Sequence, residues 1–209
     1  MLDTTVRRLI DRPLDAAGRR LARRGVSADA ITIGGFALGM AAAAAVAAGA
    51  FAAALVLLAL NRLADGLDGA VARHTQPTDR GGYLDITLDF VFYGAFPLAF
   101  ALHDPDANAL AAAVLLASFY ANGSAFLAFA AIAARRGWTT ARQGRKSIYF
   151  LAGLAEGTET ILVFALFCLF PRAFWAIALA FAGVCFVSAA ARIATATVAL
   201  SRETRPEDR

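Results

Sequence analysis

Long apolar runs constrain this chain more than any other feature, because they recur along most of its 209 residues. A helix that crosses the hydrocarbon core of a membrane needs about 20 mostly apolar residues, and six segments come close to that length or exceed it. They are rich in Ala and Leu and lack the polar–apolar alternation of barrel strands. We therefore predict an all-α fold, a bundle of six transmembrane helices at Ala30–Gly49, Phe51–Leu67, Leu84–Leu102, Ala109–Ala134, Ile148–Phe170 and Phe174–Leu200.

The overall composition argues against a soluble domain. Only 17% of the residues are charged and 59% are hydrophobic, and the mean hydropathy is +0.60, whereas soluble domains carry about 25% charged residues. The formal net charge of +4 does not indicate a nucleic-acid partner, because Lys and Arg gather at the ends of the predicted spans, where they meet anionic headgroups. We expect membrane lipids around the chain and no nucleic acid.

The distribution of Lys and Arg also predicts the orientation of the chain. These residues gather before the first span and after the second, fourth and sixth spans, which all lie on one side of a six-span bundle. Positive residues favour the cytoplasmic side of a membrane. We therefore expect both termini in the cytoplasm, and the length and charge pattern suit a bacterial inner membrane.

The whole chain, residues 1–209, is expected to form a single membrane domain. Residues 1–26 place apolar side chains on one helical stripe and Arg on the other faces, which is typical of an amphipathic helix lying at the cytoplasmic interface. The spans occupy residues 27–200, and residues 201–209 form a cytoplasmic tail. The apolar stripe consists of Val6, Ile10, Leu14, Ala17 and Leu21.

Four carboxylates, those of Asp65, Asp68, Asp85 and Asp89, lie in or beside the second and third apolar runs. Each acid inside a membrane costs about 2.5 to 3.5 kcal/mol on insertion scales. Since a helix advances about 100° per residue, the first two acids share one helical face and the last two share another. Two adjacent helices therefore bring four carboxylates toward one pocket.

Divalent cations are the partners that best explain this acidic cluster. Four unpaired negative charges repel one another, and sets of carboxylate oxygens suit hard ions such as Mg²⁺, Mn²⁺ or Ca²⁺, whereas the lack of His and Cys argues against zinc. A site this acidic suits two ions. In the alternative, the acids merely pair with Arg62, Arg73 and Arg80 and lock the helices together, although four acids exceed three arginines.

Small residues and an arginine follow the first two acids and indicate phosphoryl chemistry. Gly69 and Ala72 share the helical face of Asp65, where short side chains let a bulky ligand approach. Arg73 offers a fork suited to phosphate. Gly81 is near the start of the next run, where free helical N–H groups can meet an anion.

The spacing of these residues resembles the signature of the CDP-alcohol phosphotransferase family. All eight fixed positions are filled, in the order Asp65-x2-Asp68-Gly69-x2-Ala72-Arg73, seven residues, Gly81-x3-Asp85-x3-Asp89. The six-span layout and the N-terminal amphipathic helix are also similar to that family. One departure lies at the entry to the first span, where Ala28 and Asp29 replace a frequent Pro-Asn pair, although Ile31 and Thr32 fit.

The resemblance implies an enzyme of phospholipid biosynthesis. It would transfer a substituted phosphate from a CDP-linked lipid, such as CDP-diacylglycerol, to an alcohol and release CMP, using two Mg²⁺ or Mn²⁺ ions. The implied metal ligands are Asp65, Asp68, Asp85 and Asp89, with Asp89 also as the general base. The implied nucleotide-binding residues are Thr32, Asp65, Gly69, Ala72, Arg73 and Gly81. Homodimers are common in the family, so a homodimer is expected.

The acceptor alcohol is indicated only by charge. Arg135, Arg142 and Lys146 lie at the predicted cytoplasmic mouth and suit an acidic acceptor such as glycerol 3-phosphate or inositol phosphate, although the positive-inside pattern explains these charges equally well. Glu156 and Glu159, three residues apart, suit a polar acceptor pocket. Pairing of these glutamates with Arg192 or an interfacial Arg is an equal alternative.

Two other classes of protein also use intramembrane carboxylates. A divalent-cation transporter needs them, but it does not need Gly69, Ala72 and Arg73 in register beside them, and the chain lacks the repeated halves typical of many transporters. A non-catalytic scaffold would tolerate replacement of Asp65 and Asp68 by Asn. Metal-dependent release of CMP from a CDP-lipid distinguishes the enzyme from both.

Overall fold

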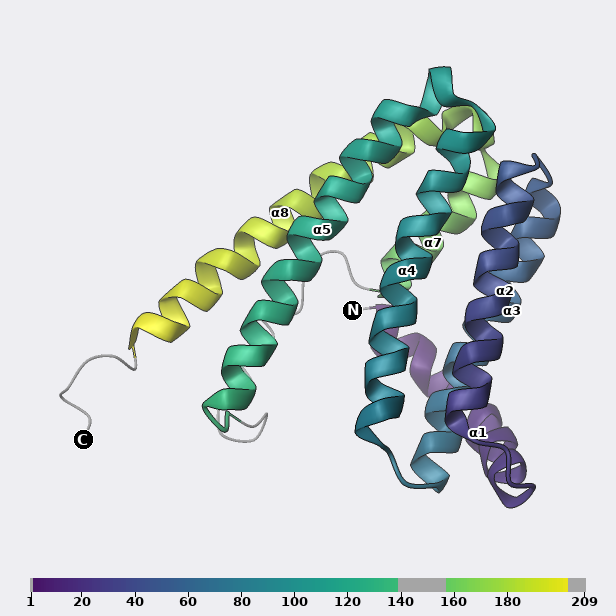
Figure 1. The fold of residues 1–209 in the computed structure, drawn as a ribbon, viewed down its shortest axis with the longest axis vertical. Helices are drawn as coiled ribbons and strands as arrows, with labels where there is room; N and C mark the ends of the chain where they lie inside the picture. Colours follow the sequence, from purple (N-terminus) through teal and green to yellow (C-terminus); the bar gives the residue numbers. More distant parts are fainter. Residues whose placement is uncertain (1, 139–156, 203–209) are drawn as a thin grey trace. The chain divides into compact units, whose positions relative to one another are not determined.

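A computed structural model describes residues 2–138 and 157–202 of the chain, which form helices connected by short turns (Figure 1). Within these ranges there are seven α-helices and one short 3-10 helix, and no strand. The prediction of an all-α fold is confirmed. The elements are α1 (Leu2–Arg23), α2 (Ala28–Ala47), α3 (Phe51–His74), α4 (Asp79–His103), α5 (Pro105–Arg135), α7 (Gly157–Leu169), η1 (Pro171–Ala173) and α8 (Phe174–Arg202).

Four segments among the described residues are long and apolar enough to cross a membrane: α2, α4, α5 and the stretch Pro171–Ser201. They coincide with the first, third, fourth and sixth predicted spans. The second predicted span lies on α3, which also carries the charged side chains of Arg62, Asp65 and Asp68. The fifth overlaps the shorter apolar helix α7 and extends into residues 139–156, which lie outside the described ranges.

Local sequence signals explain where the helices next to the acids begin and end. The hydroxyl of Ser27 accepts a hydrogen bond from the Ala30 backbone at the start of α2, and that of Thr78 accepts one from the Gly81 backbone at the start of α4. Because of the Thr78 cap, α4 begins at Asp79, five residues before the predicted span at Leu84. Helix α3 is also longer than the second predicted span, because it continues past the predicted end at Leu67 to His74.

The chain divides into two compact units. The first contains residues 1–109 and 164–174, and the second contains residues 110–163 and 175–209. In the first unit α2 packs along α3 and α4, while α1 packs on α3 (Figure 1). A Cβ atom added to Gly18 of α1 would lie only 2.6 Å from Cβ of Ala70, so the close approach of α1 to α3 requires this glycine.

Aromatic rings fill the core of the first unit. Phe92, Phe96 and Phe100, spaced along one side of α4, are at most 1% exposed. The Phe96 ring stacks on that of Phe164 and the Phe100 ring on that of Phe174, with centroids 4.5 Å apart in both pairs. We call these five residues, together with Phe167, whose ring centroid lies 4.7 Å from that of Phe174, the aromatic column.

The second unit contains most of α5 and α8. Its buried side chains are small or apolar, among them Leu115, Ala182 and Ala189. The rings of Phe119 and Phe181 meet edge to face. Among the described residues of this unit, one charged side chain is buried: Arg192 of α8 is 7% exposed, and its guanidinium carbon lies 5.3 Å from the ring centroid of Phe126.

Candidate active site

The acidic residues line a pocket of the first unit, built by α2, α3 and α4. The pocket lies beside the Phe92 end of the aromatic column, since Phe92 contributes to both. Its polar lining combines carboxylates with one arginine, one asparagine and one threonine. The lining residues are Thr32, Gly35, Phe36, Asn61, Arg62, Asp65, Asp68, Asp85, Leu88, Asp89 and Phe92.

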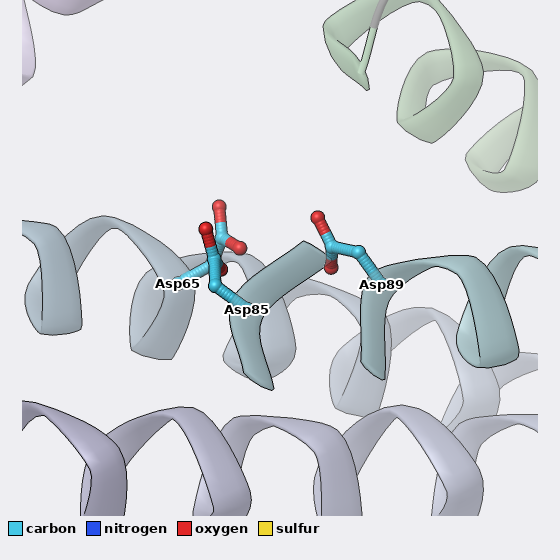
Figure 2. A group of neighbouring side chains, drawn as sticks. All are labelled: Asp65, Asp85 and Asp89. Atoms are coloured by element: carbon cyan, nitrogen blue, oxygen red, sulfur yellow. The ribbon is translucent and has the colours of Figure 1, made fainter. Parts of the chain in front are cut away.

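Three of the four predicted acids form a tight cluster. Asp65 of α3 and Asp85 and Asp89 of α4 each place one carboxylate oxygen within 4.8 Å of the other two. Figure 2 shows the three side chains extending from the two helices into the same space. A divalent ion binds oxygens at roughly 2.0 to 2.6 Å, so oxygens at this separation fit around a shared ion. We call Asp65, Asp85 and Asp89 the acidic cluster.

Asp68 lines the same pocket but has a protein partner of its own. Its side chain is buried, and its Oδ2 accepts a hydrogen bond of 2.7 Å from the hydroxyl of Thr32 on α2. Of the four acids expected to converge, three therefore form the acidic cluster, and Asp68 lies at its border in the same pocket. The role of Asp68 as a metal ligand stays a prediction.

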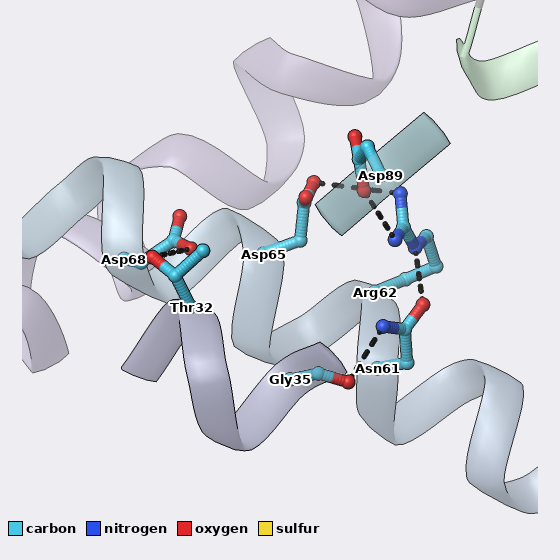
Figure 3. A network of polar contacts seen from close by, with 7 residues as sticks. All are labelled: Thr32, Gly35, Asn61, Arg62, Asp65, Asp68 and Asp89. Carbon is cyan, nitrogen blue, oxygen red and sulfur yellow. Dashed lines mark hydrogen bonds and ion pairs between the residues drawn. The ribbon is translucent and has the colours of Figure 1, made fainter. Parts of the chain in front are cut away.

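Arg62 contacts two acids of the cluster, as Figure 3 shows. Its Nη2 lies 3.4 Å from Oδ1 of Asp89, and its Nη1 lies 3.7 Å from Oδ2 of Asp65. Its Nε donates a 2.8 Å hydrogen bond to Oδ1 of Asn61. Asn61 in turn donates a 2.8 Å hydrogen bond to the backbone carbonyl of Gly35 on α2.

From the sequence, Arg62 is predicted only as a possible partner for the acids, and Asn61 is not predicted to belong to the site. A signal was present, because an Asn-Arg pair one helical turn before Asp65 is unusual inside an apolar run. The sequence does not show that α2 packs beside this turn of α3, where the Gly35 carbonyl accepts the hydrogen bond of the Asn61 amide.

Ion pairing alone does not neutralise the acidic cluster. Of the three arginines considered from sequence, only Arg62 has an ion pair with it in the described structure. Arg80 pairs with Asp29 instead, with Nε and Oδ2 3.6 Å apart, and Arg73 is exposed near the end of α3. Three carboxylates facing one guanidinium leave an excess of negative charge, which fits the binding of divalent cations.

The predicted nucleotide-binding residues lie around this pocket in two groups. Thr32 and Asp65 line it directly. Gly69, Ala72 and Arg73 occupy the following turns of α3, where all three are at least partly accessible. Gly81 lies in the first turn of α4, where an added Cβ atom would lie 3.1 Å from Oδ1 of Asp29, the residue at the departure from the family pattern.

The predicted acceptor residues belong to other parts of the chain. Arg135 is the exposed last residue of α5, and Glu159 is half-buried in the first turn of α7; both belong to the second unit. Arg142, Lys146 and Glu156 lie outside the described residues. Their predicted contribution to acceptor binding is not tested by the structure.

A family model and one curated relative each match most of the chain, and a second relative matches part of it. A sequence model of the CDP-alcohol phosphatidyltransferase family matches residues 26–189. Inner membrane protein YnjF of Escherichia coli (strain K12) is 46% identical over 193 residues, which are 92% of this chain and 94% of that protein. An archaetidylinositol phosphate synthase of Pyrococcus horikoshii is 34% identical over 85 residues, 40% of this chain and 45% of that protein.

A solved structure also shares the fold. The crystal structure of Mycobacterium tuberculosis phosphatidylinositol phosphate synthase with CDP-DAG bound matches with a TM-score of 0.60 and 24% sequence identity. The match covers 95% of this chain and 98% of that one. At this identity the similarity is evidence for the fold alone.

Proposed function

The chain belongs to the CDP-alcohol phosphatidyltransferase family, and on that premise we propose that it transfers a phosphatidyl group from a CDP-linked lipid to an alcohol and releases CMP. The family resemblance predicted from the motif is thereby confirmed, as are its classes: transferase, phospholipid biosynthesis and membrane protein. The observation that carries the proposal is the convergence of Asp65, Asp85 and Asp89 from two helices.

The acidic cluster is the proposed metal centre. The family uses divalent metals, and the cluster supplies the all-oxygen donor set that Mg²⁺ and Mn²⁺ prefer. Asp65, Asp85 and Asp89 would hold the ions, with Asp68 as a fourth ligand at the border. Two ions at this position would counter the negative charge of the diphosphate and of the departing CMP.

Asp89 is the proposed general base. It is the last acid along α4 and is only half-buried, so an acceptor hydroxyl can reach it from the pocket. Its carboxylate would take the hydroxyl proton while the acceptor oxygen bonds to the lipid-side phosphorus, and the bond from that phosphorus to the oxygen of CMP breaks. Alcohol and CDP-lipid thus give a phosphatidyl-alcohol and CMP.

The donor nucleotide would lie along the end of α3 and the start of α4. Gly69 and Ala72 leave room for the cytidine, and the exposed Arg73 can reach a diphosphate with its guanidinium. Thr32 and Gly81 would border the same nucleotide. The M. tuberculosis structure, with CDP-DAG bound, supports CDP-diacylglycerol as the form of donor to test first.

For the acceptor we propose an alcohol that carries a phosphate. Arg135, Arg142 and Lys146 would attract it, and Glu156 and Glu159 would bind its hydroxyls. The names of two relatives, an archaetidylinositol phosphate synthase and a phosphatidylinositol phosphate synthase, support this class. Inositol phosphate and glycerol 3-phosphate are the first candidates.

The proposed placement is a multi-pass chain of six spans in a bacterial inner membrane, with both termini and the active site toward the cytoplasm. YnjF, the 46% identical relative, is an inner membrane protein. Helix α1 would lie at the cytoplasmic interface. A homodimer is proposed for the assembled enzyme.

The test supplies purified protein in detergent with radiolabelled CDP-diacylglycerol, Mg²⁺ or Mn²⁺, and a panel of alcohols. We expect CMP release and one new lipid with a single acceptor, and no release in EDTA. Asp89→Asn should still bind the CDP-lipid but lose CMP release, whereas Asp79→Asn, an exposed acid in the first turn of α4, should keep it. Mn²⁺ flux into liposomes without any CMP release would instead identify a transporter.

A further inference from the structure

Arg62 occupies a position in which its charge and that of a metal ion would compete. Its guanidinium ion-pairs with Asp89 at 3.4 Å and with Asp65 at 3.7 Å, and both carboxylates belong to the cluster that fits a divalent ion. A cation bound by the cluster would therefore lie within a few ångströms of a fixed positive charge. Like charges at that separation repel strongly in a partly buried site.

The surroundings of Arg62 hold it in place independently of the acids. Its Nε donates to Asn61, which is 4% exposed and is itself held by the Gly35 carbonyl. Its guanidinium carbon lies 5.5 Å from the ring centroid of Phe92, on the face of the aromatic column. An arginine held from two sides is not a surface side chain that pairs with the acids by chance.

We propose that Arg62 is the internal counter-cation of the acidic cluster: it neutralises Asp65 and Asp89 when no metal is bound, and it weakens the binding of divalent ions. This inference rests on the proposed metal site. Without Arg62, an empty cluster would place three mutually repelling carboxylates in a partly buried pocket. With Arg62, two of the carboxylates are paired when no metal is bound, but the affinity of the cluster for divalent ions is lower.

The sign of the effect separates this role from a purely structural one. If Arg62 only supported the pocket, its removal would disorder the carboxylates and weaken metal binding. If it competes with the ion, its removal strengthens metal binding and destabilises only the metal-free protein. Metal affinity and metal-dependent stability are therefore the readouts, and neither requires the enzyme to turn over.

The experiment compares Arg62→Gln and Arg62→Met, which remove the charge, with Arg62→Lys, which retains a positive charge. Full-length proteins are purified in detergent with Mn²⁺, stripped with EDTA and titrated with Mn²⁺ alone, with free Mn²⁺ followed by electron paramagnetic resonance. The matched control is Arg80→Gln, because Arg80 has a similar 3.6 Å contact with Asp29 outside the cluster. Melting temperatures are measured in EDTA and at saturating Mn²⁺.

We expect both neutral variants to bind Mn²⁺ about tenfold more tightly than the original protein, and the Lys variant and the Arg80 control to stay within about twofold of it. In EDTA the neutral variants should melt earlier, and saturating Mn²⁺ should remove that difference. Unchanged or weaker Mn²⁺ binding in both neutral variants would overturn the inference. If the original protein binds no Mn²⁺, the metal site itself is refuted, and so is the proposed competition between Arg62 and the metal.

Discussion

The first half of α4 carries acidic side chains and the second half carries buried aromatic rings. Asp85 and Asp89 precede Phe92, Phe96 and Phe100 at spacings of three or four residues, so one side of the helix presents acids first and rings afterwards. The rings are buried against other rings of the same unit. The acids face one another and a single guanidinium.

Packing that stabilises the fold and the proposed metal site therefore occupy separate stretches of one helix. The aromatic column finds its partners within the chain, so its packing should contribute to folding whether or not a ligand is present. The acidic cluster carries more negative charge than Arg62 neutralises, which fits the proposed binding of cations rather than a contribution to folding.

The largest expected effect tests the acidic half. Replacing Asp65 and Asp85 together by Asn should lower the rate of CMP release by at least about a thousandfold, because the proposed metal ions lose two ligands. The same change removes charge repulsion, so the melting temperature in EDTA should stay equal or rise. The measurements are CMP release and thermal unfolding of the metal-free protein. A large fall in that melting temperature would contradict the separation of roles.

The next effect tests the aromatic half. Phe96→Ala should lower the free energy of unfolding by about 3 kcal/mol, because it opens a cavity between the rings of α4 and α7. Leu98→Ala on the same helix is the control, since Leu98 is 48% exposed and its loss should cost much less. Unfolding is followed by denaturant titration in detergent. Equal losses in the two variants would show that the column is not the stabilising core.

The division of α4 into an acidic half and an aromatic half could be predicted from the sequence only in part. Apolar runs placed the helices, and helical phase grouped the acids, because both depend on local spacing. Helical phase does not reveal which neighbouring helix each face meets. Asp65 and Asp68 differ by about 60° around α3, and that is enough for Asp65 to face α4 and for Asp68 to face Thr32 of α2.

The partnership of Thr32 and Asp68 predicts a smaller effect, since Asp68 is the acid of the pocket that the protein itself satisfies with a hydroxyl. Thr32→Val removes the donor of the 2.7 Å hydrogen bond and leaves a buried carboxylate without it. We expect a loss of about 1 to 2 kcal/mol in unfolding free energy, measured in EDTA by denaturant titration. Thr32→Ser keeps the hydroxyl and should recover most of the loss. If Val and Ser behave alike, the hydrogen bond does not stabilise the fold.

The smallest effect concerns a carboxylate outside the membrane-spanning segments, which completes the comparison. Asp15 of α1 accepts a 2.9 Å hydrogen bond from Arg19 and lies 2.8 Å from Nε2 of His74 on α3. The hydrogen bond from Arg19, followed by that from His74, holds the pKa of Asp15 below its ordinary value of 3.8. Unlike the acidic cluster, this carboxylate is paired by the protein, so it should contribute to stability without any ligand.

The sign of its pH dependence follows from the lowered pKa. A carboxyl whose folded pKa is depressed contributes stability above its ordinary pKa, and that contribution is lost as the pH falls through the lowered value. Asp15→Asn should therefore melt about 1 to 2 °C below the original protein at pH 5. The difference should begin to shrink as the pH falls below 3.8, should disappear once the pH is below the lowered pKa, and should be smaller in high salt. A difference that did not shrink at all as the pH was lowered from 5 through 3.8 and below would mean that Asp15 holds α1 on α3 by packing rather than by charge.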